Sequence, residues 1–348
     1  MASWSPVARA FALPALLAAG LVAAAGFGDP GAGLPQNLRA AGFGGDGAVA
    51  FSPQYPLWSD GADKERWMRL PPGTAIDASD PDAWQFPPGT QLWKSFSVAG
   101  RPVETRYMER AADGSWRFGT YVWNEAGTDA QLAPARGVAA LPVATAPGRR
   151  YAIPSRTDCL ACHASASVPV LGVSALQLSP DRDPLAPGAR PPGPQHADLR
   201  ALVARGWVRG LPRELLEQPP RIAADTPVER AALGYLHGNC AHCHNGSDNR
   251  VPVRLTLAQR VRDPRASRDE ALRSAVQAPA RWRAADADDA VVIHPGHAAA
   301  SALAQRMQSR EKRVQMPPLA TQWPDPDGLA VVLRWINQDL TLPKEKLQ

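Results

Sequence analysis

Cysteine and tyrosine are scarce in this sequence, with four and five residues among 348. All four cysteines lie in two Cys-x-x-Cys-His motifs, so none remains for a structural disulfide. The chain has no long run of lysine or arginine, and its net charge of +5 is spread along its length, which argues against a nucleic-acid partner. By contrast, the 36 prolines indicate long ordered loops rather than many helices.

The two motifs are Cys159-Leu160-Ala161-Cys162-His163 and Cys240-Ala241-His242-Cys243-His244. In a motif of this kind two thiols add across the vinyl groups of a haem, and the adjacent imidazole coordinates the iron from one side. The sequence therefore predicts two covalently attached haem c groups. The attachment sites are Cys159, Cys162, Cys240 and Cys243, and the iron ligands are His163 and His244.

Two other chemistries use a Cys-x-x-Cys pair. A structural zinc site needs four ligands at suitable spacing, which the two motifs could supply together. A redox dithiol requires a thioredoxin-like βαβ setting, which this sequence lacks. Zinc is thus the main alternative to haem.

The N-terminal stretch predicts export. Arg9 precedes an apolar run from Ala10 to Ala25 that ends in three alanines, a pattern typical of a secretory signal peptide. The run is too short for a confident membrane span, and an uncleaved anchor is the alternative. Because haem is attached to such motifs outside the cytoplasm, we expect a periplasmic or secreted protein with no stable membrane span after cleavage.

The expected fold class is α+β, with an antiparallel β-rich domain followed by a mostly α-helical domain. The predicted segments are a signal peptide (1–25), a flexible lead-in (26–50), a β-rich domain (51–150), a first haem-binding segment with a proline-rich excursion (151–222), and the helical domain (223–348). Strands are expected at 90–98, 103–108 and 116–123, where Asp113-Gly114 indicates a hairpin. The aromatic residues concentrated there favour a β-domain core, the alternative being an aromatic surface for a sugar or a partner.

Helices are expected at 198–208, 269–276 and 298–308, and two more carry clear start signals. One starts after Thr226, with Pro227 at its first position and Glu229 completing a capping box, and Gly238 is expected to end it. The last begins at Asp325-Pro326 and has an apolar face of Leu329, Val332, Leu333 and Ile336.

From Thr226 to about Leu340, the order of helix, haem motif, short helices, Met-Pro-Pro loop and terminal amphipathic helix resembles a class I c-type cytochrome domain. The runs Pro295-Gly296 and Met316-Pro317-Pro318 are similar to a subgroup common in secreted bacterial cytochromes. The resemblance implies that His244 is the proximal iron ligand and Met316 the distal one. Independently, a residue before proline is held extended, so the loop would present the thioether of Met316 rigidly. Met307 is the rival, but its helical spacing with Leu303 predicts a core residue.

The first haem has no Met-Pro-Pro partner nearby, so its distal ligand stays open. Met68 and Met108 lie in the β-rich domain, and the other histidines are His196, His294 and His297. We predict His237, because a helical position three residues before Cys240 is preorganised and would bring the first haem against the second domain. The alternative is a surface or propionate-bonding histidine.

The whole chain, including Tyr55-Pro56-Leu57-Trp58-Ser59-Asp60, resembles an exported bacterial family of two-haem c-type cytochromes with no assigned role. The leading expectation is electron transfer to or from a redox partner protein. The rival is an enzyme similar to a dihaem peroxidase or oxygenase, with an open first haem. A third class is a binding module in which the β-rich domain recognises a carbohydrate or a protein.

Overall fold

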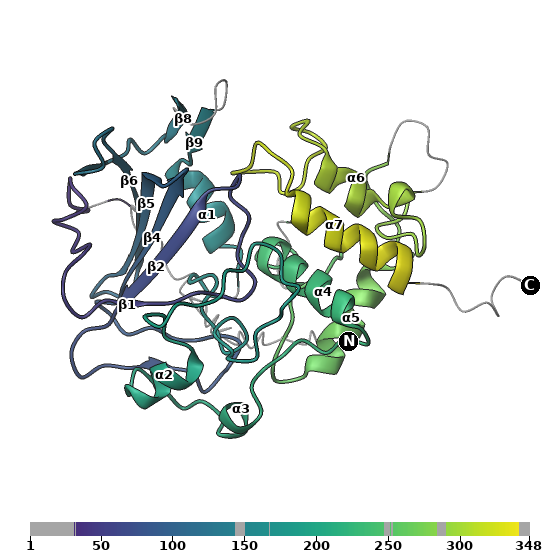
Figure 1. Cartoon of the computed structure of the whole chain (residues 1–348), viewed down its shortest axis with the longest axis horizontal. Coiled ribbons are helices and arrows are strands. Elements are labelled where there is room, and N and C mark those ends of the chain that lie inside the picture. The colour runs from purple at the N-terminus through teal and green to yellow at the C-terminus, as the bar shows by residue number, and fades with distance from the viewer. Residues whose placement is uncertain are drawn as a thin grey trace, which may run out of the picture.

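The computed structural model describes residues 31, 33–142, 150–166, 168–246, 251, 253–283 and 290–340. The predicted signal peptide lies outside these residues. The protein has a mixed α+β structure, with an antiparallel sheet at one side and a group of helices at the other (Figure 1). No helix in the described ranges is long and apolar enough to span a membrane.

The main sheet has six strands in the order β1-β2-β4-β5-β6-β7, and every neighbouring pair is antiparallel. Its strands are β1 (Val49–Ala50), β2 (Asp63–Arg69), β4 (Gln91–Val98), β5 (Arg101–Arg110), β6 (Trp116–Trp123) and β7 (Ala130–Leu132). Two small pairs flank it: β3 (Ile76–Asp77) with β10 (Val208–Arg209), and β8 (Val138–Pro142) with β9 (Arg150–Ile153). The three strands predicted from the sequence are confirmed as β4, β5 and β6.

Side chains alternate between the two faces of the sheet, as the strand period of two requires. On β4, Trp93 packs on one face with Tyr107 and Tyr121, whereas Leu92 packs on the other with Met68 and Phe118. The predicted strands contain seven aromatic residues, and all of them except the half-buried Trp123 are buried: Trp93, Phe96, Tyr107, Trp116, Phe118 and Tyr121. The aromatic cluster therefore forms core rather than an exposed binding surface.

The stretch predicted as a flexible lead-in packs against the sheet. Leu34, Leu38 and Ala41 are buried against Trp93 and Tyr121. The backbone of Leu38 also donates to the carbonyl of Ala130 on β7, at 3.0 Å. The segment was predicted to be flexible because it is rich in Gly and Ala. Its three apolar residues, at helix-like spacing, instead cover the outer face of the sheet.

The helices are α1 (Arg156–His163), α2 (Leu199–Ala204), α3 (Glu214–Glu217), α4 (Pro227–Cys240), α5 (Pro264–Ala275), η1 (Ala298–Ala300), α6 (Ala302–Gln308) and α7 (Pro326–Arg334), which continues into the π-helical η2 (Trp335–Asp339). Helices α4 and α7 pack against each other, and α1 lies beside the sheet on the side facing them (Figure 1). One hydrophobic core runs from Met68 and Phe118 of the sheet to Leu233, Val332 and Ile336 of these helices.

The predicted cap of α4 is confirmed in part. The hydroxyl of Thr226 accepts from the backbone of Glu229, but the Glu229 carboxylate accepts from the backbone of Asp225 rather than completing a capping box. Gly238 does not end the helix, which continues to Cys240. A Cβ at Gly238 would lie 2.5 Å from the carbonyl oxygen of Tyr55, so this glycine serves close packing.

Candidate functional site

The first Cys-x-x-Cys-His motif lies on a short helix rather than in a loop. Ser155 and Asp158 form a reciprocal capping box at the start of α1, the local signal that sequence reasoning missed. Cys159 and Cys162 project from this helix as half-buried free thiols, and burial raises the pKa of both. The cap fixes the start of the helix, which positions the two thiols and the histidine at its end.

His163 ends α1 in a geometry that suits a metal ligand. Its Nδ1 lies 2.5 Å from the carbonyl oxygen of Pro169, and because a carbonyl can only accept, Nδ1 carries the proton. Burial lowers the pKa of His163 to about 4, so the ring is neutral and its Nε2 keeps a free lone pair. The ring also packs on Phe118 of β6, with centroids 5.1 Å apart. A hydrogen bond from Nδ1 to a backbone carbonyl commonly orients a metal-binding histidine.

The second motif follows directly from α4. Cys240 is the last residue of the helix, and its carbonyl accepts from the backbone of Cys243 at 3.1 Å and of His244 at 2.8 Å. Burial, followed by the charge of Arg306, lowers the pKa of His244 to about 4. Its Nδ1 is buried without a hydrogen-bond partner. A buried polar atom without a hydrogen bond costs free energy.

The two motifs meet. The side chain of Asn245 donates to the carbonyl of Ser165 at 3.0 Å, which joins the segments that follow the two motifs. The pKa of the Cys162 thiol rises to about 11 through burial and then through the charge of Cys243, a cysteine of the other motif. The chain therefore brings together two motifs that are 77 residues apart, counted from His163 to Cys240.

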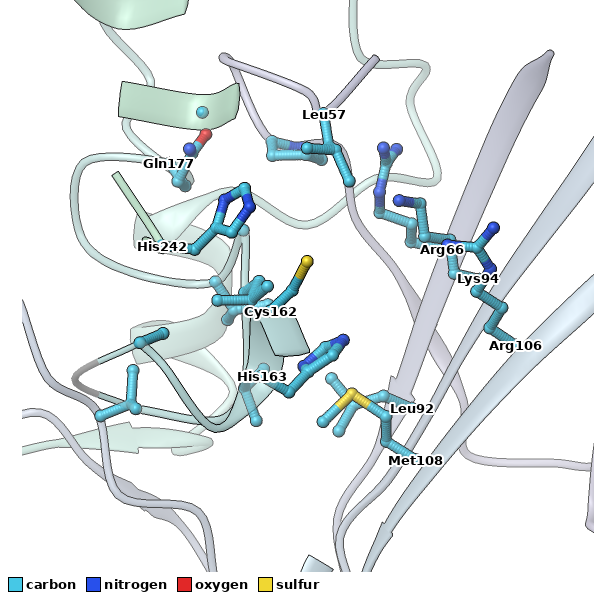
Figure 2. A pocket seen from close by; sticks show the side chains of 18 of the residues that line it. Leu57, Arg66, Leu92, Lys94, Arg106, Met108, Cys162, His163, Gln177 and His242 are labelled. Atoms are coloured by element: carbon cyan, nitrogen blue, oxygen red, sulfur yellow. The ribbon is translucent and has the colours of Figure 1, made fainter. Parts of the chain in front are cut away.

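A cavity of about 260 Å³ lies where the motifs and the sheet come together (Figure 2). Motif residues Cys159, Cys162, His163 and His242 line it, as does His237 on α4. The sheet contributes apolar residues, among them Leu92, Met108 and Phe118, and also the cations Arg66, Lys94 and Arg106. Among the described residues, no group of three or more His, Cys, Asp or Glu side chains is placed to hold a metal ion. The geometry thus gives no support to a shared zinc site.

His237 lies at this cavity, as the prediction of a first-haem ligand requires, but its ring is already engaged. Its Nδ1 accepts from the backbone of Gln259 at 3.1 Å, and burial lowers its pKa to about 4. A neutral ring whose Nδ1 accepts must carry its proton on Nε2. Iron ligation through either nitrogen would therefore require this hydrogen bond to break.

The structure places other possible ligands that the sequence left open or overlooked. His242, inside the second motif, lines the cavity, and burial followed by His244 lowers its pKa to about 4. Met108 also lines the cavity, near His163 (Figure 2), whereas Met68 is fully buried in the core. The others lie elsewhere: His196 accepts from the backbone of Gly193, and His294 and His297 pack edge to face with ring centroids 4.7 Å apart.

Met316 and Met307 differ as predicted in their settings. Met307 is 7% exposed on α6 and belongs to the core. Met316 is half-buried on a loop, where its backbone donates to the carbonyl of Arg306 at 2.9 Å and its bond to Pro317 is cis. The side chain of Gln315 holds the carbonyl of Pro317 at 3.1 Å. The loop is thus fixed at both ends of the Met-Pro bond.

One signal for the cavity was present in the sequence. Along β4, Leu92, Lys94 and Phe96 lie on the same face, so a cation stands at an inward position between two apolar residues. A polar residue at a core position needs a partner within the fold or a ligand.

Comparison of this chain with protein-family models, with curated proteins and with solved structures found no match.

Proposed function

We propose that this protein is an exported two-haem c-type cytochrome that transfers single electrons to or from a redox partner protein. The observation that carries the proposal is the approach of two Cys-x-x-Cys-His motifs to each other, each ending in a half-buried, neutral histidine. Neutral imidazole and paired free thiols are the donor set that covalent haem requires. A haem bound at each motif would supply a one-electron ferric/ferrous couple.

The residues of the first motif have distinct tasks. Cys159 and Cys162 would hold the haem covalently, and the Nε2 of His163 would bind the iron. The carbonyl of Pro169 fixes the tautomer and the orientation of that ring, and Phe118 packs against it. The apolar side chains of Leu92 and Met108 exclude water from this part of the cavity.

For the second motif, the proposal is a class I cytochrome domain. Its support is the packing of α4, which carries the motif, against α7, together with the hydrogen-bonded loop that contains Met316. Cys240 and Cys243 would hold the haem, and His244 and Met316 would be its axial ligands. A histidine–methionine pair raises the potential of a haem iron, so the two haems would differ in potential.

The contact between the motifs supports rapid electron exchange between the two haems. Cys162 and Cys243 are near enough for the charge of one to shift the pKa of the other. Cys162 and Cys243 would each hold one haem, and the two groups together would supply one-electron chemistry at neighbouring attachment points.

A dihaem enzyme with an open first haem is the second candidate. The observation that favours it is the engagement of His237 with Gln259, which leaves no preorganised distal ligand from α4. The cavity instead offers His242 and several cations around the first motif. Binding of carbon monoxide to the reduced first haem would distinguish this candidate from a closed electron-transfer site.

The test of the leading proposal is intact-mass measurement on protein produced in a host that attaches haem c to exported proteins. The expected result is two haem additions to the mature chain. The double variant Cys159→Ala/Cys162→Ala should retain one addition, and so should Cys240→Ala/Cys243→Ala. A single addition in the unaltered protein, or bound zinc, would refute the proposal.

A further inference from the structure

The inner face of the sheet carries a row of cations across three adjacent strands. Arg66 of β2 is in register with Lys94 of β4, and Lys94 is in register with Arg106 of β5. Because the strands alternate strictly here, all three side chains leave the same face of the sheet. Like charges at directly opposed positions destabilise a sheet unless something neutralises them.

Among the described residues, an acid forms an ion pair at one end of this row. The guanidinium of Arg106 pairs with Glu104 at 2.7 Å, and Glu104 is fully buried. Arg66 is 8% exposed, and burial alone accounts for the lowering of its pKa to about 10, with no acid nearby to oppose it. Burial, followed by the charges of Arg66 and Arg106, lowers the pKa of Lys94. Within the part of the chain that the structure describes, neither Arg66 nor Lys94 forms an ion pair with a carboxylate, although the charge of Glu104 partly offsets that of Lys94.

The other acids and cations around the row are committed elsewhere. Asp158 caps α1, Asp82 accepts from the backbone of Val261 and Arg262, and Glu104 also accepts from the hydroxyl of Tyr151. Lys64, on the same face but one row further along, donates to the carbonyl of Leu57 at 2.7 Å. The ring of Phe96 lies beneath Lys94 and Arg106, at 4.9 and 4.4 Å, which stabilises cations but supplies no negative charge.

The row lies in the first-haem part of the cavity. Arg66, Lys94 and Arg106 line it together with Cys162 and His163, and their side chains gather on one side of it (Figure 2). The charge of Lys94, followed by that of Arg106, acts on His163. Arg66 and Lys94 therefore stand beside the group that the first motif would hold.

We propose that Arg66 and Lys94 bind the two propionate carboxylates of the haem attached at Cys159 and Cys162. This inference rests on the proposed function. Glu104 already offsets Arg106, so of the three cations that line the cavity, Arg66 and Lys94 remain for the two carboxylates. Thioether bonds at one edge of the haem fix the ring, so its opposite, carboxylate-bearing edge is directed to one wall of the cavity. A free oxyanion in the cavity would use the same chemistry, and the experiment separates the two sources.

The experiment uses the full chain with both haems attached and compares Arg66→Gln and Lys94→Met with Lys64→Met. The control removes a buried cation from the same sheet face at a position that does not line the cavity. Resonance Raman spectra should show a shift of the propionate-bending band at the first haem in Arg66→Gln and Lys94→Met but not in Lys64→Met. The midpoint potential of the first haem should fall in the same two variants, because a lost cation favours the ferric state.

Arg66→Lys keeps the charge and should retain the wild-type potential of the first haem. It thus separates the effect of losing the charge from an effect of substitution on folding. The second arm adds phosphate or nitrite to the unaltered protein. The propionate assignment would be overturned by an unchanged bending band in both cavity variants. It would also be overturned if added anion shifted the spectrum of the unaltered protein and Arg66→Gln and Lys94→Met abolished that shift. Absence of haem from Cys159 and Cys162 in the unaltered protein would instead refute the proposed function.

Discussion

The close contact between α4 and α7 depends on one glycine, and its replacement tests how the second motif is held. A Cβ at Gly328 of α7 would lie 2.0 Å from Cε2 of Tyr235 on α4, and 2.3 Å from Cζ. Carbon atoms in contact normally stay about 3.5–4.0 Å apart. The ring of Tyr235 is 7% exposed and is hydrogen-bonded to Asp325, the N-cap of α7, so it has no room to turn away.

The expected cost of Gly328→Ala follows from two opposing effects. Overpacking a filled core costs about 1–3 kcal/mol, and this contact is severe enough to fall near the upper end. Alanine is preferred to glycine within a helix by up to about 1 kcal/mol. The net loss of unfolding free energy is therefore about 2–3 kcal/mol, which corresponds to a Tm lower by several degrees.

Thermal unfolding followed by circular dichroism on haem-loaded protein measures this loss. Ala330, exposed on the same helix, provides the control: Ala330→Gly should cost no more than about 1 kcal/mol from helix propensity. Combining Gly328→Ala with Tyr235→Leu should cost less than the sum of the two single variants, because the smaller side chain relieves the clash. A higher Tm for Gly328→Ala, or strict additivity in the double variant, would refute the described contact.

Two further predictions concern the iron ligands. Met316→Ala should abolish the weak far-red band of thioether-ligated ferric haem and lower the potential of the second haem. Met307→Ala should keep the band, but because Met307 lies in the core it should reduce the unfolding free energy by about 2–5 kcal/mol. The opposite pattern in optical spectra would exclude Met316. For the first haem, a six-coordinate site that uses His237 predicts that reduced protein binds carbon monoxide only in His237→Ala. Binding by the unaltered protein would show an open site, and binding by neither would move the ligand to another residue.

The parts of the fold that were predictable carry their signals locally. Strand β6 and the start of α7 follow from alternation and from Asp325-Pro326, which depend on neighbouring residues alone. Strand β2 was missed because its sequence, DKERWMR, is mostly charged. Its inward positions include Arg66, and hydropathy cannot identify a strand whose buried face carries a cation.

Some residues of the candidate site were also recognisable from local sequence, whereas others could be found only from the fold. The cysteines and histidines of each motif are adjacent in sequence, so each motif could be recognised without a structure. His242 was overlooked because its position between the cysteines is unrestricted in the motif, and only the approach of the two motifs brings it to the cavity. The pairing of Arg66 with Lys94 and Arg106 depends on strand register, which the sequence of any one strand does not contain.

The distance between the motifs is set by residues outside both of them. A Cβ at Gly234 of α4 would lie 2.0 Å from the ring of Tyr55, so the helix approaches this residue as closely as glycine allows. Tyr55 is in turn fixed by its hydroxyl, which donates to Asp183 at 3.1 Å, and by its backbone, which donates to Gln177 at 3.0 Å. Because Tyr55 and Gln177 both line the cavity, the contact that places α4 also fixes the cavity's width. The separation of the two haems would then be determined by a tyrosine and a glycine that bind neither of them.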